Sequence, residues 1–364
     1  MQAGKSTVRF ERPPVIAAAA SVVGEKEGRG PLGGLFDVVE TDPMFGMKSW
    51  EEAESEAQRR ASRLALEKGG LESGDVRFLF AGDLLGQLIA TSFGIVDLGI
   101  PLFGLYGACS TMGEGMALGA MTAAAGHGDR VMALASSHFA SAERQFRFPL
   151  AYGNQRPYSS TWTVTGCGCV VIEAADAKEA AGASEAAGAS EATGVSGASK
   201  TSGRRPPLAK ITAVTAGKIV DLGARDSMNM GAAMAPAAAD TVLQHLRDMD
   251  LTPDYYDRIV TGDLGVIGRT IFLDFMAGHG WDLAERYMDC GIEIFDGARQ
   301  DTHAGGSGCG CSAVTLCAYI LPNIRRGVWK RVLFVPTGAL LSPVSFNEGQ
   351  SIPGIAHAVA LEMP

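Results

Sequence analysis

Short apolar runs alternate along this chain with longer stretches of helical periodicity. Residues 76–82, 130–135 and 331–336 are mostly apolar over their whole length, as in strands that are buried on both faces. An alternation of such strands with helices is typical of an α/β fold. The pattern therefore predicts parallel sheets covered by helices.

Two of the helical stretches have clear boundaries or a distinctive composition. Residues 49–71 place Ala53, Ala57 and Ala61 at helical spacing, and Ser49 with Glu52 forms a capping box at their start. Residues 112–125 are rich in Ala, Gly and Met. A helix of small apolar residues has little polar face, so this one is predicted to be buried on most sides.

Three segments of the first half have counterparts, in the same order and at nearly one spacing, in the second half. Residues 80–84 (FAGDL) match 260–264 (VTGDL), and 107–111 (GACST) match 308–312 (GCGCS). Residues 130–134 (RVMAL) match 331–335 (RVLFV). The chain is therefore predicted to contain two copies of one α/β unit.

A low-complexity segment separates the two copies. Residues 174–206 repeat Ala-Gly-Ala-Ser-Glu and have Val195 as their one large apolar residue, so they cannot bury enough surface to order themselves. We expect a flexible linker there, between an N-terminal half (1–173) and a C-terminal half (207–364).

Composition narrows the class of partner. The 364 residues are 46% apolar and carry a net charge of −9, which argues against nucleic acid as a partner. The N-terminus has no apolar signal-peptide region, and no window approaches the length of a spanning helix. We expect synthesis in the cytoplasm, with no signal peptide and no transmembrane segment.

The seven cysteines are expected to be reduced thiols, because the count is odd and no export signal is seen. Cys167 and Cys169 lie in a strand-like stretch, where period two places them on one face as small buried residues. A four-thiolate metal site with Cys309 and Cys311 is the alternative, but zinc sites usually have two or more residues between paired ligands. No metal site is predicted.

Cys109 is the leading candidate for chemistry. It lies between a predicted strand and the small-residue helix, and a helix N-terminus stabilises a thiolate. Glycines on both sides let the backbone approach a ligand closely. A buried structural cysteine is the alternative reading.

Two histidines and two aspartates are further candidates. His303 precedes a Gly-rich loop, and His138 follows a predicted strand, where open α/β sheets place their ligands; a structural or solvated role is the alternative for each. Asp83 and Asp263 follow matching strands, where a carboxylate caps the next helix. We expect that role for Asp263, whereas Gln87 close to Asp83 also allows a polar site.

Residues 143–156 interleave three arginines with aromatic residues. Such a segment suits an anionic aromatic ligand, through forked hydrogen bonds and stacking. A structural or partner-facing loop, such as a dimer arm, is the favoured alternative.

The duplicated halves and the segment 107–111 resemble the thiolase superfamily, which includes the ketoacyl-ACP synthases. Members carry a nucleophilic cysteine at this turn and take histidines, or a histidine and an asparagine, from the second half. His303 with Gly306 resembles one of those loops, whereas 307–311 lacks the asparagine and 351–354 replaces the terminal Cys-x-Gly loop. The resemblance implies a thiolase-like duplicated αβαβα five-layer sandwich.

A longer set of motifs, from about residue 10 to residue 361 outside the linker, resembles the stage V sporulation protein AD (SpoVAD) family. The motifs are 83–87 (DLLGQ), 105–112 (LYGACSTM), 142–149 (AERQFRFP), 152–157 (YGNQRP), 229–240 (NMGAAMAPAAAD), 303–313 (HAGGSGCGCSA) and 338–343 (GALLSP).

This resemblance implies a soluble subunit of the SpoVA complex of endospore-forming bacteria. It also implies binding of dipicolinic acid, or its calcium chelate, during uptake into the developing spore. Membrane SpoVA subunits are the implied partners, and peripheral association with the forespore or spore inner membrane is the implied location. Thiolase folds usually pair, so a homodimer is expected.

On this reading Asp83, Cys109, His138 and His303 bind the ligand in an inherited thiolase pocket, and no cofactor is required. The alternative is an acyl-transferring enzyme in which Cys109 forms a thioester and His303 acts as base or oxyanion donor. Because part of that constellation is missing, we expect a catalytically degenerate binding protein.

Overall fold

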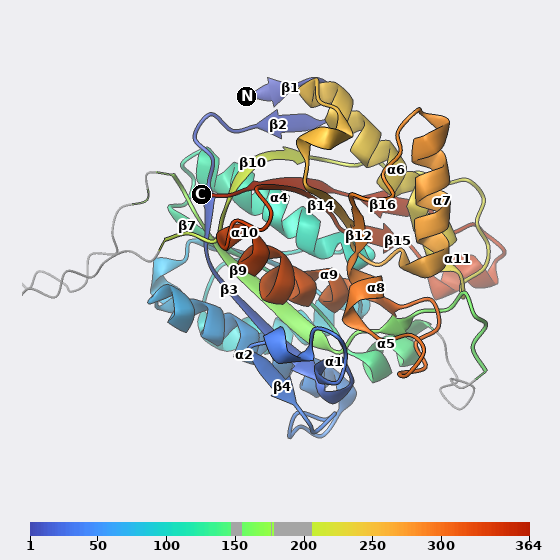
Figure 1. Ribbon diagram of the computed structural model, residues 1–364. Helices are drawn as coiled ribbons and strands as arrows, with labels where there is room; N and C mark the ends of the chain where they lie inside the picture. Colours follow the sequence, from blue (N-terminus) through green and yellow to red (C-terminus); the bar gives the residue numbers. More distant parts are fainter. Residues whose placement is uncertain (147–154, 176, 178–205) are drawn as a thin grey trace, which may run out of the picture.

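The computed structural model describes residues 1–146, 155–175, 177 and 206–364 (Figure 1). Its strands pair in the same order in the two halves. The first half contributes β3 (Val15–Gly24), β9 (Gly166–Glu173), β7 (Arg130–Ser137), β5 (Phe78–Gly82) and β6 (Leu102–Gly104). The second contributes β10 (Ala209–Thr215), β17 (Ala358–Glu362), β14 (Arg331–Val335), β11 (Arg258–Thr261) and β12 (Tyr287–Asp289). Short pairing of β10 with β3 joins the two sets of strands.

The sheets are mixed, and the prediction of purely parallel sheets is wrong in this respect. β9 is antiparallel to β3 and β7, and β17 is antiparallel to β10 and β14, whereas β5, β6 and β7, like β11, β12 and β14, run parallel. The connection from β7 to β9 begins and ends at the same edge of the sheet, because the two strands are antiparallel. The same holds for the connection from β14 to β17, and neither needs a crossover helix. Long connections therefore gather at the edge where the parallel strands end.

Helices cover both sheets and fill the space between them. α2 (Trp50–Gly69), with α3 (Ile89–Ile95) against it, covers the outer face of the first sheet. α4 (Thr111–Ala124) and α9 (Cys309–Thr315) lie between the sheets, and α6 (Met230–Met249), with α7 (Gly265–Gly278) against it, covers the second (Figure 1). The duplicated αβαβα arrangement is confirmed.

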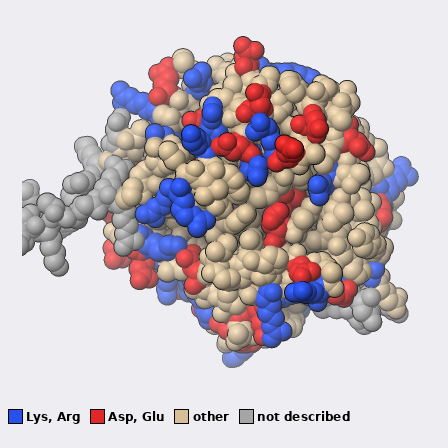
Figure 2. Space-filling view, viewed as in Figure 1, with Lys and Arg blue, Asp and Glu red and all other residues tan. Residues whose placement is uncertain are grey.

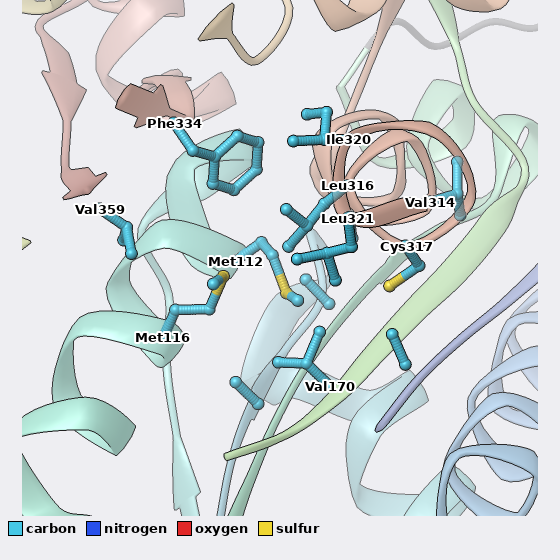
Figure 3. Close-up of a cluster of buried hydrophobic side chains, with 14 of the residues drawn as sticks. Met112, Met116, Val170, Val314, Leu316, Cys317, Ile320, Leu321, Phe334 and Val359 are labelled. Carbon is cyan, nitrogen blue, oxygen red and sulfur yellow. The ribbon is translucent and has the colours of Figure 1, made fainter. Parts of the chain in front are cut away.

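The central layer holds the largest core. Met112 and Met116 of α4 face Leu316 and Ile320 of η8 (Leu316–Ile320), a π-helical turn that continues α9 (Figure 3). Val170 of the first sheet and Phe334 and Val359 of the second close the cluster. Since both sheets contribute, the two halves share one core.

Several local predictions are confirmed. Ser49 accepts from the Glu52 amide and the Glu52 carboxylate accepts from the Ser49 amide, so the capping box begins α2. Cys167 and Cys169 are fully buried on the face of β9 that packs against α2. Shorter helices and strands of the described chain include α1 (Glu25–Gly28), α5 (Phe139–Phe146), β8 (Trp162–Thr163), α8 (Cys290–Ile294), β13 (Gly306–Ser307), α10 (Leu321–Arg325), β15 (Thr337–Ala339) and β16 (Gly354–Ala356).

Most of the expected linker, residues 176 and 178–205, lies outside the described residues, so the boundaries of the two halves stay predictions. Among the helices that the structure describes, none combines the length and hydropathy needed to cross a bilayer. Figure 2 shows acidic and basic side chains interspersed on the viewed face.

Candidate functional site

A narrow cavity of about 40 Å³ opens at the edge where the parallel strands end. Its lining comes from both halves of the chain, which agrees with a site at their boundary. Within the described residues the lining comprises Leu84, Tyr106, Ala108, Cys109, Ala142, Phe146, Thr163, Ser227, Met230, Ser307, Gly308, Ala339 and Leu341. It is mostly apolar, with hydroxyl groups from Tyr106, Thr163, Ser227 and Ser307.

Cys109 lies on this wall, in the tight turn that leads into α4. The preceding residue, Ala108, has a φ of 49°, which is strained for a residue with a Cβ. Two bonds hold this conformation: the Ala108 carbonyl accepts from Thr111 Oγ1 at 2.7 Å and from Cys309 Sγ at 2.9 Å. A thiol of the second half thus helps to fix the position of Cys109 in the first.

Asp263 is the polar partner of Cys109, and sequence analysis did not assign it to the site. The carboxyl group lies close enough to Cys109 for its charge to act on the thiol. Its Oδ2 accepts from the Gly308 amide at 3.0 Å, and its Oδ1 accepts from Thr337 Oγ1 at 2.8 Å. These two bonds hold the carboxyl group between two loops of the second half, beside the cysteine of the first.

The prediction that Asp263 caps a helix is wrong. No side chain caps α7, and Asp289 takes the amides of Leu264 and Gly265 instead. Asp263 follows β11 as Asp83 follows β5, and this matching position was the one signal that could have placed it in the site.

Of the two readings of Cys109, a reactive thiolate and a buried structural cysteine, the surroundings favour the second. Burial, with the nearby Asp263 carboxyl and Cys309, raises the pKa of Cys109 well above that of an ordinary thiol. The start of α4 does not compensate, because burial is the largest cause of this shift. Burial also raises the pKa of Asp263 to about 7.

Asp83 lies just behind the cavity wall formed by Leu84. One oxygen of its carboxylate accepts from the Leu85 amide at 2.7 Å, and the other from the amide (2.7 Å) and hydroxyl (2.6 Å) of Thr91. It is fully buried and does not line the cavity. These bonds give it a structural role at the start of α3.

Asp83 belongs to a buried chain of hydrogen bonds that ends at Glu54. Gln58 Nε2 donates to Thr91 Oγ1 and to Ser136 Oγ, and Ser136 Oγ donates to Glu54 Oε1 at 2.8 Å. Burial, and then the charge of Asp83, raises the pKa of Glu54 to about 8. The network links α2, α3 and β7 beneath the cavity loops.

His138 is buried against Trp50 and Phe45, away from the cavity lining. Its Nε2 is 2.8 Å from the Pro43 carbonyl, and its Nδ1 accepts from the Ala140 amide at 3.2 Å. Burial lowers its pKa, so the ring is neutral at pH 7. This geometry fits a packing role.

His303 belongs to a surface cluster that joins the two halves, the clasp, which consists of Arg156, Pro157, Asp301 and His303. The Nε2 of His303 is 3.0 Å from Asp301 Oδ1 and its Nδ1 is 2.9 Å from the Pro157 carbonyl. Arg156 donates to Asp301 Oδ2 at 3.0 Å and lies over the Trp162 ring. Trp162 precedes Thr163 on β8, which pairs with β13, so the clasp supports one wall of the cavity from outside.

The structure therefore brings Cys109 together with Asp263, and leaves Asp83, His138 and His303 outside the described lining. The arginine-rich candidate is only partly visible, because residues 147–154 lie outside the described residues. Its Arg144 pairs with Glu51, and Arg156 belongs to the clasp. No three His, Cys, Asp or Glu side chains of the described chain are arranged to hold a metal ion.

Solved structures with this arrangement define the class of protein. One is 3-oxoacyl-(acyl carrier protein) synthase III from Xanthomonas oryzae pv. oryzae, with a TM-score of 0.55 and 14% identity, covering 98% of this chain and 100% of that one. Another is cerulenin-bound OleA from Xanthomonas campestri, with a TM-score of 0.54 and 13% identity over 98% of each chain. At these identities the likeness shows a thiolase-like fold alone.

The particular family comes from sequence comparison. The family model for stage V sporulation protein AD (SpoVAD) matches residues 4–362. The stage V sporulation protein AD of Bacillus subtilis (strain 168) is 41% identical over 359 residues, which cover 99% of this chain and 97% of that protein. This chain belongs to the SpoVAD family of sporulation proteins.

Proposed function

We propose that this chain binds dipicolinic acid, free or as its calcium chelate, at the cavity beside Cys109, which widens from its volume of about 40 Å³ to admit the ligand. The observation that carries the proposal is a cavity, lined by residues of both halves, whose wall includes the buried thiol of Cys109. Tyr106 and Phe146 supply aromatic surface for a pyridine ring, and the hydroxyls of Ser227 and Ser307 supply donors for carboxylates.

Acyl transfer is the second candidate, because the similar solved structures include acyl-condensing enzymes. It needs a reactive thiolate, and burial beside a carboxyl group disfavours one at Cys109. His303, the expected base, bonds to Asp301 and does not line the cavity. We therefore propose a binding protein that does not catalyse acyl transfer.

Ligand delivery to the developing spore needs a membrane route. We propose that the membrane SpoVA subunits provide it, and that the chain associates peripherally with the forespore or spore inner membrane. Membership of a sporulation family supports this proposal.

The test is calorimetric titration with dipicolinic acid, with and without calcium. We expect one saturable site in the wild type, at least tenfold weakened in Cys109→Ala, since about 1.4 kcal/mol corresponds to tenfold. Cys317→Ala is the matched control, because Cys317 is a buried thiol outside this cavity and should leave affinity unchanged.

Two results would count against the proposal. Equal affinity in the wild type and Cys109→Ala would remove the ligand from this cavity. Stable acylation of Cys109 by an acyl-CoA donor, without dipicolinate binding, would favour the enzyme.

A further inference from the structure

Asp263 is a buried carboxyl group directly behind the cavity wall. It is 1% exposed, and its Oδ2 accepts from the amide of Gly308, a residue that lines the cavity. Its Oδ1 accepts from Thr337 Oγ1. Its charge also acts on Cys109, another lining residue. A ligand seated against Cys109 is therefore one residue away from this carboxyl group.

The groups around Asp263 do not neutralise a second negative charge. Asp289, in the same half, is a second carboxyl group close to it. The charge of Asp263 also raises the pKa of four nearby thiols, those of Cys109, Cys290, Cys309 and Cys311. The described residues of the cavity lining include no Lys, Arg or His. An ionised Asp263 would thus repel a ligand carboxylate in a poorly solvated site.

Protonation removes the charge and leaves the hydrogen bonds in place. The ionised carboxylate accepts from the Gly308 amide and Thr337 Oγ1, and the protonated acid keeps enough acceptor positions for both. The neutral acid therefore presents no charge to a ligand carboxylate beside Cys109.

We infer that Asp263 determines specificity in this cavity: it must be protonated for an anionic carboxylate ligand to bind, and binding takes up about one proton from solvent. The proton stays on the Asp263 carboxyl group, and no covalent bond of the ligand changes. This inference rests on the proposed function. Burial raises the pKa of Asp263 to about 7, so this exchange falls near neutral pH.

Proton uptake is measured by titrating dipicolinate into the protein at pH 8 in HEPES and in Tris, which differ in ionisation heat. We expect uptake of about one proton per ligand bound. Well above neutral pH the apparent affinity should fall about tenfold per pH unit, because the fraction of the protein with protonated Asp263 falls by that factor. In Asp263→Asn, an uncharged side chain of the same shape, uptake should vanish and affinity should become independent of pH.

Glu114→Gln is the matched control. Glu114 lies in the first turn of α4, its pKa is also raised by burial, and it does not line the cavity. The Glu114→Gln variant should bind dipicolinate and take up the same number of protons as the wild type.

Three results separate the claims. Wild-type binding without proton uptake overturns the inference and leaves the proposed function standing; this measurement needs no variant. Loss of uptake in Glu114→Gln but not in Asp263→Asn would assign the proton elsewhere and overturn it too. No binding by the wild type even at pH 6 would contradict the proposed function, and the inference with it.

Discussion

At the scale of single residues, Cys109 occupies the turn where a nucleophile is expected but has the environment of a buried, protonated thiol. It is 6% exposed and lies beside the buried Asp263 carboxyl group. The strained Ala108 next to it is held by bonds from Thr111 and Cys309. These bonds fix the backbone of the turn, and burial raises the pKa of the Cys109 thiol, which favours its protonated form.

This environment predicts slow alkylation of Cys109. Iodoacetamide at pH 8 should label it at least about tenfold more slowly than a free thiol with a pKa near 8.5, because little thiolate forms and access is narrow. Site-resolved mass spectrometry gives the rate, and labelling in urea, where all thiols react, is the control. Labelling at the rate of a free thiol would contradict the account of a buried, protonated thiol.

Glu54 predicts a pH dependence of stability. Its pKa is raised from 4.5 to about 8 in the folded protein, so the folded chain holds a proton that the unfolded chain releases. The free energy of unfolding should then fall as the pH rises from about 5 to 8, by up to about 1.4 kcal/mol per pH unit for this one group.

Glu54→Gln isolates that contribution. Urea unfolding at several pH values should give a shallower slope for the variant than for the wild type. Identical slopes would mean that Glu54 is ionised in the folded protein.

Some residues of the site could be predicted from the sequence and some could not. The turn motif around Cys109 marked it as a site residue, and the cavity lining includes it. Asp263 was assigned to a helix cap, because local pattern cannot show that its oxygens reach Thr337 and Gly308 instead. Contacts between distant segments decide such cases.

At the scale of elements, α9 lies closer to β9 than side chains normally permit. A Cβ at Gly168 would lie 2.4 Å from the backbone of Ala313. Gly168→Ala should therefore push the central helix from the sheet and reduce the free energy of unfolding by about 1–3 kcal/mol.

Urea unfolding measures the loss for Gly168→Ala. Gly74→Ala, where a Cβ meets no neighbour, is the control and should change stability by less than about 0.5 kcal/mol. A fully stable Gly168→Ala variant would show that α9 can move away freely.

Elements with a strong local signal were predicted well. The capping box located the start of α2, and the apolar runs located β5, β7 and β14. The antiparallel directions of β9 and β17 were missed, because apolar pattern does not encode strand direction.

At the scale of the whole molecule, the duplication seen in three short matches extends to the strand order and directions of both sheets. The first sheet ends at β6, whose side chains are exposed. The nearby apolar side chains with substantial exposure are Ile89, Phe93, Val96, Leu102 and Phe103. We propose that a second copy of the chain covers this edge, which gives the expected homodimer.

The dimer prediction is tested by light scattering after gel filtration. The wild type should have twice the chain mass, and Phe103→Glu should have the monomer mass, because a charge at the edge opposes strand pairing. Val328→Glu is the control, since Val328 is as exposed but follows α10. A monomeric wild type would contradict the prediction.

The most direct test of the central claim is a crystal structure of the protein with calcium and dipicolinic acid. The account predicts ligand density against Cys109, between Tyr106 and Ser307, with anomalous signal there if calcium enters as the chelate. The main competing location is the polar groove of about 490 Å³ that includes Arg77 and Arg130. Density in that groove, with the Cys109 cavity empty, would contradict the account.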